Sequence, residues 1–410
     1  MRRILALSLV MLLVALELAG CTVAPKQKKE APRTGSVRVL VLGGSGLETT
    51  LTNAFTSANP GVTVETVRFP DGDFQAVMSK LKSGDPKVDV IVAPGNSFLF
   101  SQGVVTPLDD LIKAEKLDVE PYGHSLELAR FGGKVYGLPV MISPMLVTYN
   151  RQLFEQAGLK QPEPGWTWSD FDNAVKRLAE LQAKSGKEKA WAFAVPDWTI
   201  VDLLLTSGRG PADSDLGPLR STLERLRQMQ SIDRAMPKDR PGDKDVEYYQ
   251  AFARGEVAMV LNYWEYSFAH ASPTFAWGMV PIPVFSGEAQ TPGVATLAMV
   301  SATAENKENA FAFASFVSGN TGAQAVVRMP GAPFPGYVNA TIQKDWLAHA
   351  KLKDDSAFLM KLRYLPTAVY PDALVPLLLK EADAVLAGQK SPDAAIADYQ
   401  KAREPILSKK

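Results

Sequence analysis

The run GGSG at 43–46 is the first place where this chain could do chemistry, because a glycine turn before a helix often binds phosphate. A dinucleotide fingerprint starting at Gly44 requires glycine at 49, where the chain has Thr49, and the lysine of a phosphate-binding loop is absent. A nucleophile elbow starting at Gly43 requires glycine at 47, where the chain has Leu47. We therefore predict a tight turn that serves a polar ligand, with ligand-binding candidates Ser45, Gly46 and Glu48.

Neither a metal site nor an acid–base pair is indicated by residue spacing. The pairs Asp109-Asp110 and Asp354-Asp355 are adjacent in sequence and suit surface turns, although two carboxylates distant in sequence can meet in space. The three histidines lie far apart, and the body of the chain has no cysteine that could hold a metal. We therefore predict no catalytic residue, no metal and no cofactor, and keep a secreted hydrolase only as an alternative.

Cys21 is the single cysteine in 410 residues, and it ends an N-terminal export signal. Two arginines precede an apolar run from Ile4 to Leu16, which is shorter than the roughly 20 residues of a membrane-spanning helix. The segment Leu18-Ala19-Gly20-Cys21 resembles a bacterial lipobox, whose cysteine is lipidated and becomes the mature N-terminus. We predict a signal peptide at 1–20 and a lipidated Cys21 that begins a flexible tether at 21–36; an ordinary secretory signal is the alternative.

The composition of the chain is typical of a globular protein. The hydrophobic share is 46% and the charged share is 21%, and the length fits two domains. Residues 36–410 hold 38 basic and 42 acidic residues without a basic stripe, which argues against a nucleic-acid partner. No further apolar run is long enough to span a bilayer. We therefore expect an extracytoplasmic body that is anchored to the cell membrane only through the lipid on Cys21.

Strands and helices alternate along the first part of the body, which predicts an α/β fold with mainly parallel sheets and helices on both faces. The predicted strands there are 37–42, 62–69 and 88–92, with helices at 47–58 and 74–83. Further strands are predicted at 146–149, 257–261, 278–281 and 295–301, and further helices at 167–184, 216–230, 247–253, 306–317, 374–386 and 392–406. Thr167 or Ser169 suits the N-cap of the helix at 167–184.

Five segments, in the same order, resemble extracellular solute-binding proteins of bacterial ABC importers, of the carbohydrate-binding, maltose-binding-protein-like kind. They are Lys134–Pro139 with Tyr149-Asn150, Pro164–Phe171, Phe252–Met259, Asn306–Phe311, and Gly388–Pro392 with the final helix. The resemblance implies the two-lobed type II periplasmic-binding-protein fold, with hinge crossings near 141–145, 292–296 and 326–330. It divides the body into an N-terminal lobe (37–143 plus 295–326) and a C-terminal lobe (146–292 plus 330–410).

A sugar site needs aromatic rings for the faces of the sugar and polar groups for its hydroxyls. The spacing of the family places its binding tryptophan at 265, where this chain has Glu265. We therefore expect Trp264, one residue earlier, to be the stacking platform, with Asn262 and Tyr263 beside it. The alternative for Trp264 is a tryptophan that only packs the lobes together.

Other loops add candidates to this site. Asp197 and Trp198 match a second-lobe binding loop, and the alternative there is a surface turn with a packed tryptophan. Asn96 and Ser97 follow the third strand, at the strand ends where doubly wound sheets bind ligands, although the family often has an acidic residue at the place of Asn96. Weaker candidates are Ser143 in the hinge and Tyr370 before a late helix.

The resemblance implies a monomeric receptor that closes on a sugar or oligosaccharide and delivers it to the permease subunits of an ABC importer. A lipid anchor suits this role, because it keeps the receptor near the membrane without embedding it. The departures at 96, 262 and 265 leave room for another solute, such as a polyol or a phosphodiester. A solute-binding fold that acts as an interaction or sensor protein, without transport, is the competing hypothesis.

Overall fold

The computed structural model describes the body of the chain from Thr34 onward, with gaps. The described residues are 34–42, 47–67, 74–84, 87–95, 97–195, 201–203, 206, 209–232, 234–237, 245–264, 273–284, 289–331, 333–350, 359, 361–365 and 373–408. The signal peptide, Cys21 and most of the tether lie outside them, so those assignments stay predictions. Within the described ranges, no helix is both long enough and apolar enough to cross a membrane.

The first three strands form a parallel sheet that is most deeply buried at its third strand. β1 (Gly35–Val41) lies between β2 (Val62–Val67) and β3 (Val90–Pro94) and pairs with both in parallel. Four successive residues of β3, from Val90 to Ala93, are buried, as expected for a strand covered on both sides. Two helices make the connections between these strands and have the bounds that the sequence predicts: α2 (Leu47–Ala58) and α3 (Phe74–Ser83).

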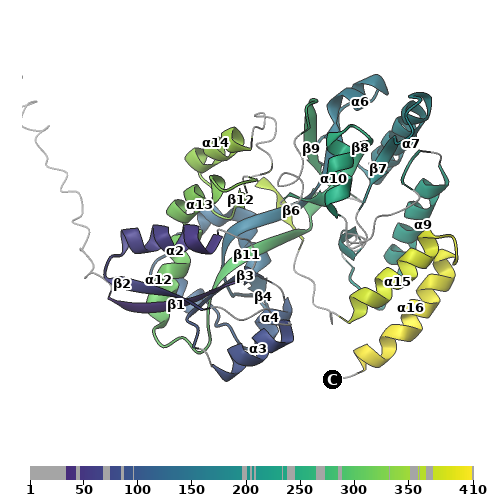
Figure 1. The fold of residues 1–410 in the computed structure, drawn as a ribbon. Helices are drawn as coiled ribbons and strands as arrows, with labels where there is room; N and C mark the ends of the chain where they lie inside the picture. The colour runs from purple at the N-terminus through teal and green to yellow at the C-terminus, as the bar shows by residue number, and fades with distance from the viewer. Residues whose placement is uncertain are drawn as a thin grey trace, which may run out of the picture.

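The long strand β6 (Leu138–Asn150) belongs to two sheets. Its first half, up to Pro144, pairs with β11 (Gly293–Val300). Its second half, from Met145, pairs with both β8 (Val257–Tyr263) and β9 (Trp277–Pro281). Figure 1 shows β6 running from one half of the molecule into the other. The change of partner between Pro144 and Met145 falls inside the predicted hinge segment 141–145.

The strand order through both sheets is β2-β1-β3-β11-β6-β8-β7, where β7 is Trp191–Ala194. The outer pairs β1–β2, β1–β3 and β7–β8 are parallel, whereas β11 and β6 run antiparallel to their neighbours. The predicted parallel pattern therefore holds at both ends of the order and not in the middle. The reason is that β6 and β11 carry the chain across between the two halves in opposite directions.

The helices of the first half pack largely through aromatic and aliphatic side chains. α12 (Lys307–Ser318) covers β11, β6 and β1, and α13 (Asn320–Val327) packs on both α2 and α14 (Ala340–His349). The ring of Phe55 on α2 meets that of Phe313 on α12 edge to face, with centroids 4.9 Å apart. Three shorter helices follow β3: α4 (Ser97–Ser101), α5 (Asp109–Ala114) and the 3₁₀ helix η1 (Glu120–Ala129).

In the second half, α7 (Trp168–Lys184) begins at a capping box. The Thr167 hydroxyl accepts a hydrogen bond from the Asp170 backbone N–H (3.2 Å), and the Asp170 carboxylate accepts one from the Thr167 N–H (2.8 Å). Thr167, rather than Ser169, is therefore the N-cap. The other helices of this half are α6 (Arg151–Gln156), α9 (Gly217–Ser231), α10 (Asp245–Ala253), α15 (Leu374–Leu386) and α16 (Pro392–Leu407).

Two large hydrophobic clusters define what we call the first lobe and the second lobe. The first cluster contains β1, β3, β11 and the start of β6, and the second contains α7, α9, β8 and the closing helices. β12 (Phe334–Pro335), α14 and the described residues from Leu359 to Tyr364 pack in the first cluster, where β12 pairs with β6 at Met141 and Ile142. The sequence placed them in the second lobe, with a crossing near 326–330. After Tyr364, the first described residue that packs with the second cluster is Val375.

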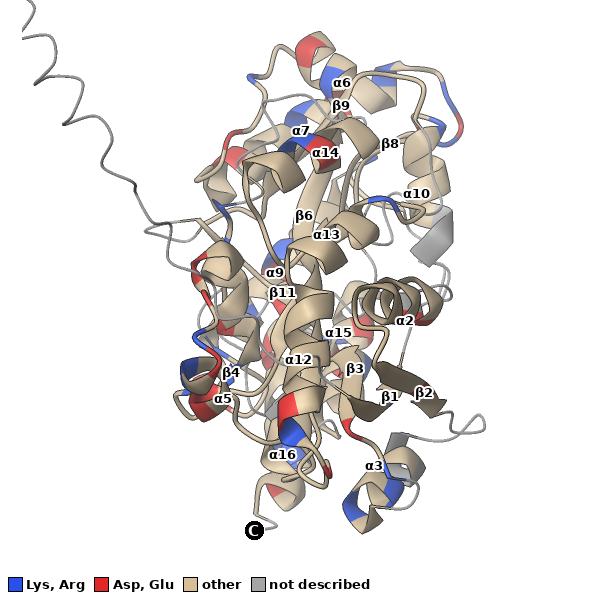
Figure 2. Ribbon diagram, turned by 90° about the vertical axis from the view of Figure 1, so that its left-hand side faces the viewer, with Lys and Arg blue, Asp and Glu red and all other residues tan. Residues whose placement is uncertain are grey.

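Two small pairs of strands complete the fold. β4 (Arg130–Phe131) and β5 (Lys134–Val135) form a hairpin, and β10 (Gln290–Thr291) pairs in parallel with β13 (Arg363–Tyr364). Charged residues of both signs alternate on the helices and loops, whereas β6 and β11 carry none (Figure 2). The central strands are therefore a core element without charged side chains.

Candidate ligand-binding site

The structure describes part of the predicted site. Glu48, Ser143, Tyr263 and Trp264 are described in full, and Ser97 and Asn262 are described by their backbone alone. The other candidates lie outside the described residues: Ser45, Gly46, Asn96, Asp197, Trp198 and Tyr370. Their roles in binding therefore stay predictions.

The end of β8 brings three candidates to the place where the two lobes join. Asn262 pairs with Leu146 of β6, and Tyr263 pairs with Met145, the first residue of β6 that belongs to the second sheet. Tyr263 is buried in the second cluster, whereas the next residue, Trp264, belongs to the first cluster. The boundary between the lobes therefore passes between these two neighbouring residues.

Trp264 is buried against two aromatic residues of the first lobe. Its ring lies 5.3 Å from that of Trp346 at an angle of 51°, and Trp346 meets Phe334 edge to face at 4.9 Å. Only 1% of the Trp264 surface is exposed. This packing is the alternative that the sequence left open for Trp264. Its role as a stacking platform stays a prediction, and it requires these rings to separate.

Tyr263 donates a hydrogen bond to the carboxylate of Asp202, a residue that the sequence reasoning missed. Asp202 lies in the short helical segment 201–203, between the buried residues Val201 and Leu203. Burial raises the pKa of Asp202 to about 7, and the hydrogen bond from Tyr263 opposes part of that rise. A carboxylate inside the apolar run at 200–205 was the signal that could have found it.

Ser143 lies close to several hydrogen bonds at the point where β6 passes from the first lobe to the second. Its backbone pairs with Val294 of β11, and only 4% of its surface is exposed. One residue on from Pro144, the Met145 N–H donates to the Pro292 carbonyl at 2.9 Å, and the hydroxyl of Thr291 donates to the Met145 carbonyl. These bonds tie β6 to the segment entering β11, so the two crossings at 141–145 and 292–296 lie side by side.

Tyr364 covers the same crossing from β13. Its ring lies so close to Gly293 that a Cβ there would be 2.5 Å from the Tyr364 Cδ1 atom, so the site requires glycine. Burial raises the pKa of Tyr364, and its hydroxyl has no hydrogen-bond partner among the described residues. The crossing is therefore packed tightly on the side of Tyr364.

Glu48 lies in the first turn of α2, where an acidic side chain favours the positive end of the helix dipole. It is partly exposed, and its main-chain carbonyl accepts a hydrogen bond from the Thr52 hydroxyl at 2.9 Å. Its position after β1 agrees with the predicted edge of the sheet. Nothing else in the described geometry assigns it a ligand.

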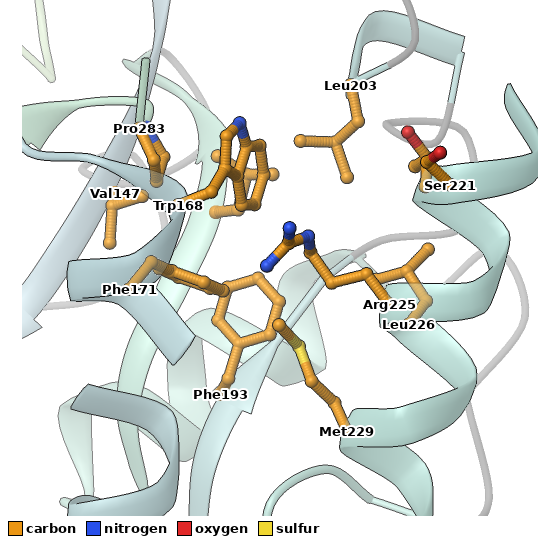
Figure 3. Close-up of a pocket in the computed structure, with 12 residues that line it drawn as sticks. Val147, Trp168, Phe171, Phe193, Leu203, Ser221, Arg225, Leu226, Met229 and Pro283 are labelled. Atoms are coloured by element: carbon orange, nitrogen blue, oxygen red, sulfur yellow. The ribbon is translucent and has the colours of Figure 1, made fainter. Parts of the chain in front are cut away.

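A separate cavity lies inside the second lobe, between α7, α9 and the sheet (Figure 3). Its volume is about 30 Å³, and its walls include Trp168, Phe171, Phe193 and Met229. The Arg225 guanidinium points into it, 5.1 Å from the centre of the Trp168 ring, and forms an ion pair with Asp172. A sugar-sized ligand needs a pocket of several hundred Å³. This cavity is therefore too small to be the solute site. Elsewhere, the described acidic and histidine side chains form no group that could hold a metal ion.

Comparison with known proteins gives one family match and several distant relatives. A family model described as bacterial extracellular solute-binding protein matches residues 42–324. A protein of Brucella abortus, named only as a binding protein, is 24% identical over 375 residues, which cover 87% of this chain and 88% of the relative. An uncharacterised lipoprotein of Streptomyces antibioticus is 26% identical over 341 residues, covering 77% of this chain and 73% of the relative.

Solved structures share the fold over nearly the whole chain. A sugar transporter protein of Rhizobium etli, in an open conformation, has a TM-score of 0.75 at 22% identity and covers 89% of this chain and 98% of its own. The sugar-binding protein MalE of Xanthomonas citri has a TM-score of 0.72 at 18% identity, covering 91% and 98%. UgpB of Mycobacterium tuberculosis, in complex with glycerophosphocholine, has a TM-score of 0.67 at 22% identity, covering 92% and 99%. At these identities the likeness establishes the fold alone.

Proposed function

The chain belongs to the bacterial extracellular solute-binding protein family, and from that premise we propose that it is a lipid-anchored receptor that delivers a sugar or oligosaccharide to an ABC importer. The observation that carries the proposal is the family match at 42–324, which includes both crossings and residues of both lobes. Membership makes the chain a solute-binding protein rather than an enzyme. The sugar is proposed because solved proteins of this fold include a sugar transporter protein and MalE.

The proposed binding mode is closure of the two lobes over the solute. The strand ends at the lobe boundary supply the polar and aromatic groups, and the crossing at Pro144 and Met145 is the hinge. Residues proposed to bind the solute are Trp264, Tyr263, Asn262, Trp198, Asp197, Asn96, Ser97, Ser45, Gly46, Glu48, Ser143 and Tyr370.

Binding of a solute can be tested by thermal unfolding of the purified protein. Suitable probes are maltose, maltotetraose, tagatose and glycerophosphocholine, each bound by a solved protein of this fold. A ligand present at a hundred times its dissociation constant stabilises the folded state by about 2.7 kcal/mol. A rise in Tm with a sugar supports the proposal. No rise across this panel and a wider sugar panel favours the interaction or sensor hypothesis instead.

A non-sugar solute is the second candidate, and the likeness to UgpB in complex with glycerophosphocholine favours it over others. The probe panel separates the two, because a rise in Tm with glycerophosphocholine alone assigns a phosphodiester. The receptor role would stand in that case, and the sugar would be withdrawn.

The proposed lipid anchor rests on Cys21 and on the relative named as a lipoprotein. Cys21→Ser removes the thiol that would carry the lipid. We expect the variant to lose incorporation of a radiolabelled fatty acid and to leave the membrane fraction of expressing bacteria. Equal labelling of the two proteins would contradict the anchor.

A further inference from the structure

Asp202 is a carboxylate for which the described part of the chain provides few partners. Tyr263 donates one hydrogen bond to it, and among the described residues no Lys, Arg or His forms an ion pair with it. A carboxylate can accept about four hydrogen bonds, and one that is held away from water without them destabilises the folded state. Such a group calls for an explanation outside the packing of the lobe itself.

Its position in the fold gives that explanation. Segment 201–203 follows β7 closely, and Tyr263 ends β8, so both residues lie at the carboxyl ends of a parallel pair of strands. Ligands of open α/β sheets bind at such ends. Tyr263 pairs with Met145, one residue beyond the point where β6 changes its partner from the first lobe to the second. Asp202 is therefore within one tyrosine side chain of the lobe boundary.

We propose that the Asp202 carboxylate, held in place by the Tyr263 hydroxyl, accepts a hydrogen bond from a hydroxyl group of the solute at the lobe boundary. This inference rests on the proposed function and assigns to its site a residue from the second lobe. Asp202 as a whole residue is partly exposed, so the lobe does not enclose it completely. The solute supplies the missing donors, so closing over it removes an unfavourable burial and the solute is selected for a hydroxyl at that place.

Two variants test the assignment. Asp202→Asn keeps the shape of the side chain but removes its charge. We expect it to weaken binding of the sugar identified from maltose, maltotetraose and tagatose by about 10- to 100-fold, the usual effect of a hydrogen bond to a charged group. The same variant should raise the Tm of the unliganded protein at pH 8, because it removes a poorly compensated charge. Opposite changes in affinity and stability distinguish a binding role from a structural one.

The control is Asp393→Asn on α16, which removes an exposed carboxylate of the second lobe that forms an ion pair with Arg220. It should leave the affinity unchanged. Tyr263→Phe removes the hydroxyl that positions Asp202 and should weaken binding by about 2- to 10-fold, so it carries the test if the first variant does not fold.

The outcomes separate the inference from the function on which it rests. A wild-type protein that binds a sugar while Asp202→Asn binds it equally well overturns the inference alone. A lower Tm with unchanged affinity also overturns it, because Asp202 would then only support the fold. A wild-type protein that binds none of the probes overturns the proposed function, and the inference with it.

Discussion

Asp89 in the first lobe and Asp202 in the second are carboxylates whose pKa values are shifted in opposite directions by their surroundings. Asp89 accepts two hydrogen bonds from the Arg38 guanidinium, at 2.9 and 3.0 Å, and one each from the backbone N–H groups of Arg38 and Glu305. Desolvation alone would raise the pKa of Asp89, but these bonds outweigh it and hold the pKa below its usual value. Among the described residues, Asp202 has one donor, Tyr263, and its pKa is raised to about 7.

We interpret the difference as that between a carboxylate that supports the fold and the one that we propose binds the solute. Asp89 lies at the start of β3, away from the strand ends that face the other lobe, and it connects β1 to the turn before α12. All of its partners come from the chain. Asp202 is hydrogen-bonded to Tyr263, next to the lobe boundary, and the described residues provide no other donor to it. A structural carboxylate therefore differs from a carboxylate that can bind a ligand in the number of hydrogen bonds that the protein donates to it, and not in burial alone.

The largest expected effect is the loss of stability on changing Asp89, the carboxylate that is paired with Arg38. Asp89→Asn removes the charge that compensates the half-buried Arg38, so we expect the free energy of unfolding to fall by about 3–5 kcal/mol. Urea unfolding at pH 7 measures the change. The control is Glu305→Gln, which removes the exposed partner of Arg38 and should cost less than about 1 kcal/mol. Similar losses for the two variants would contradict a special role of Asp89.

The second effect is a dependence of stability on pH, with opposite signs for the two carboxylates. The raised pKa of Asp202 means that its contribution to stability is present below its ordinary pKa of 3.8 and is lost as the pH rises through about 7. We expect the free energy of unfolding to fall by on the order of 2–4 kcal/mol between pH 4 and pH 8, and Asp202→Asn to abolish this fall. Asp89, whose pKa is lowered, contributes above pH 3.8 and loses its contribution on acidification. A wild-type profile that is flat from pH 5 to pH 8 would contradict the raised pKa.

The third effect concerns the aromatic neighbour of the Asp202–Tyr263 pair. If Trp264 is a stacking platform, Trp264→Phe should weaken sugar affinity by about 3- to 10-fold, because the smaller ring covers less of the sugar face. Calorimetric titration measures it. Trp346→Phe changes the first-lobe ring that packs on Trp264 and should alter stability with little effect on affinity. Equal affinity in Trp264→Phe and the wild type would leave Trp264 as a residue that only packs the lobes.

The smallest expected effect is a loss of stability in the second lobe, away from the lobe boundary. It tests whether solute affinity depends on the lobe boundary or on the stability of the second lobe as a whole. Thr167→Ala removes the hydroxyl of the capping box of α7, far from β8 in sequence. We expect a loss of about 1 kcal/mol in the free energy of unfolding and no change in affinity. A loss of affinity that matches Asp202→Asn would show that any destabilisation of this lobe impairs binding, and would weaken the comparison.

Elements whose signals are local were predictable from the sequence. α2 and α3 have the predicted bounds, because a proline or glycine ends each apolar pattern. The capping box at Thr167 and Asp170 also depends on neighbours in the chain. By contrast, the sequence assigned 330–410 to the C-terminal lobe, whereas β12 and α14 pack in the first cluster. Their place depends on the pairing of Phe334 with Ile142 and on the contact of Trp346 with Trp264, which are distant in sequence.

The sequence by itself determined the α/β class, the family resemblance and the order of most elements, because periodicity, caps and turn residues act over a few positions. It also placed candidates at strand ends, where Tyr263 and Trp264 are found. Only the tertiary structure decided that β12 and α14 pack in the first cluster, that Trp264 is covered by Trp346, and that Asp202 has Tyr263 as its donor. Burial and the pairing of a carboxylate depend on groups brought together from distant parts of the chain, and no local pattern records them.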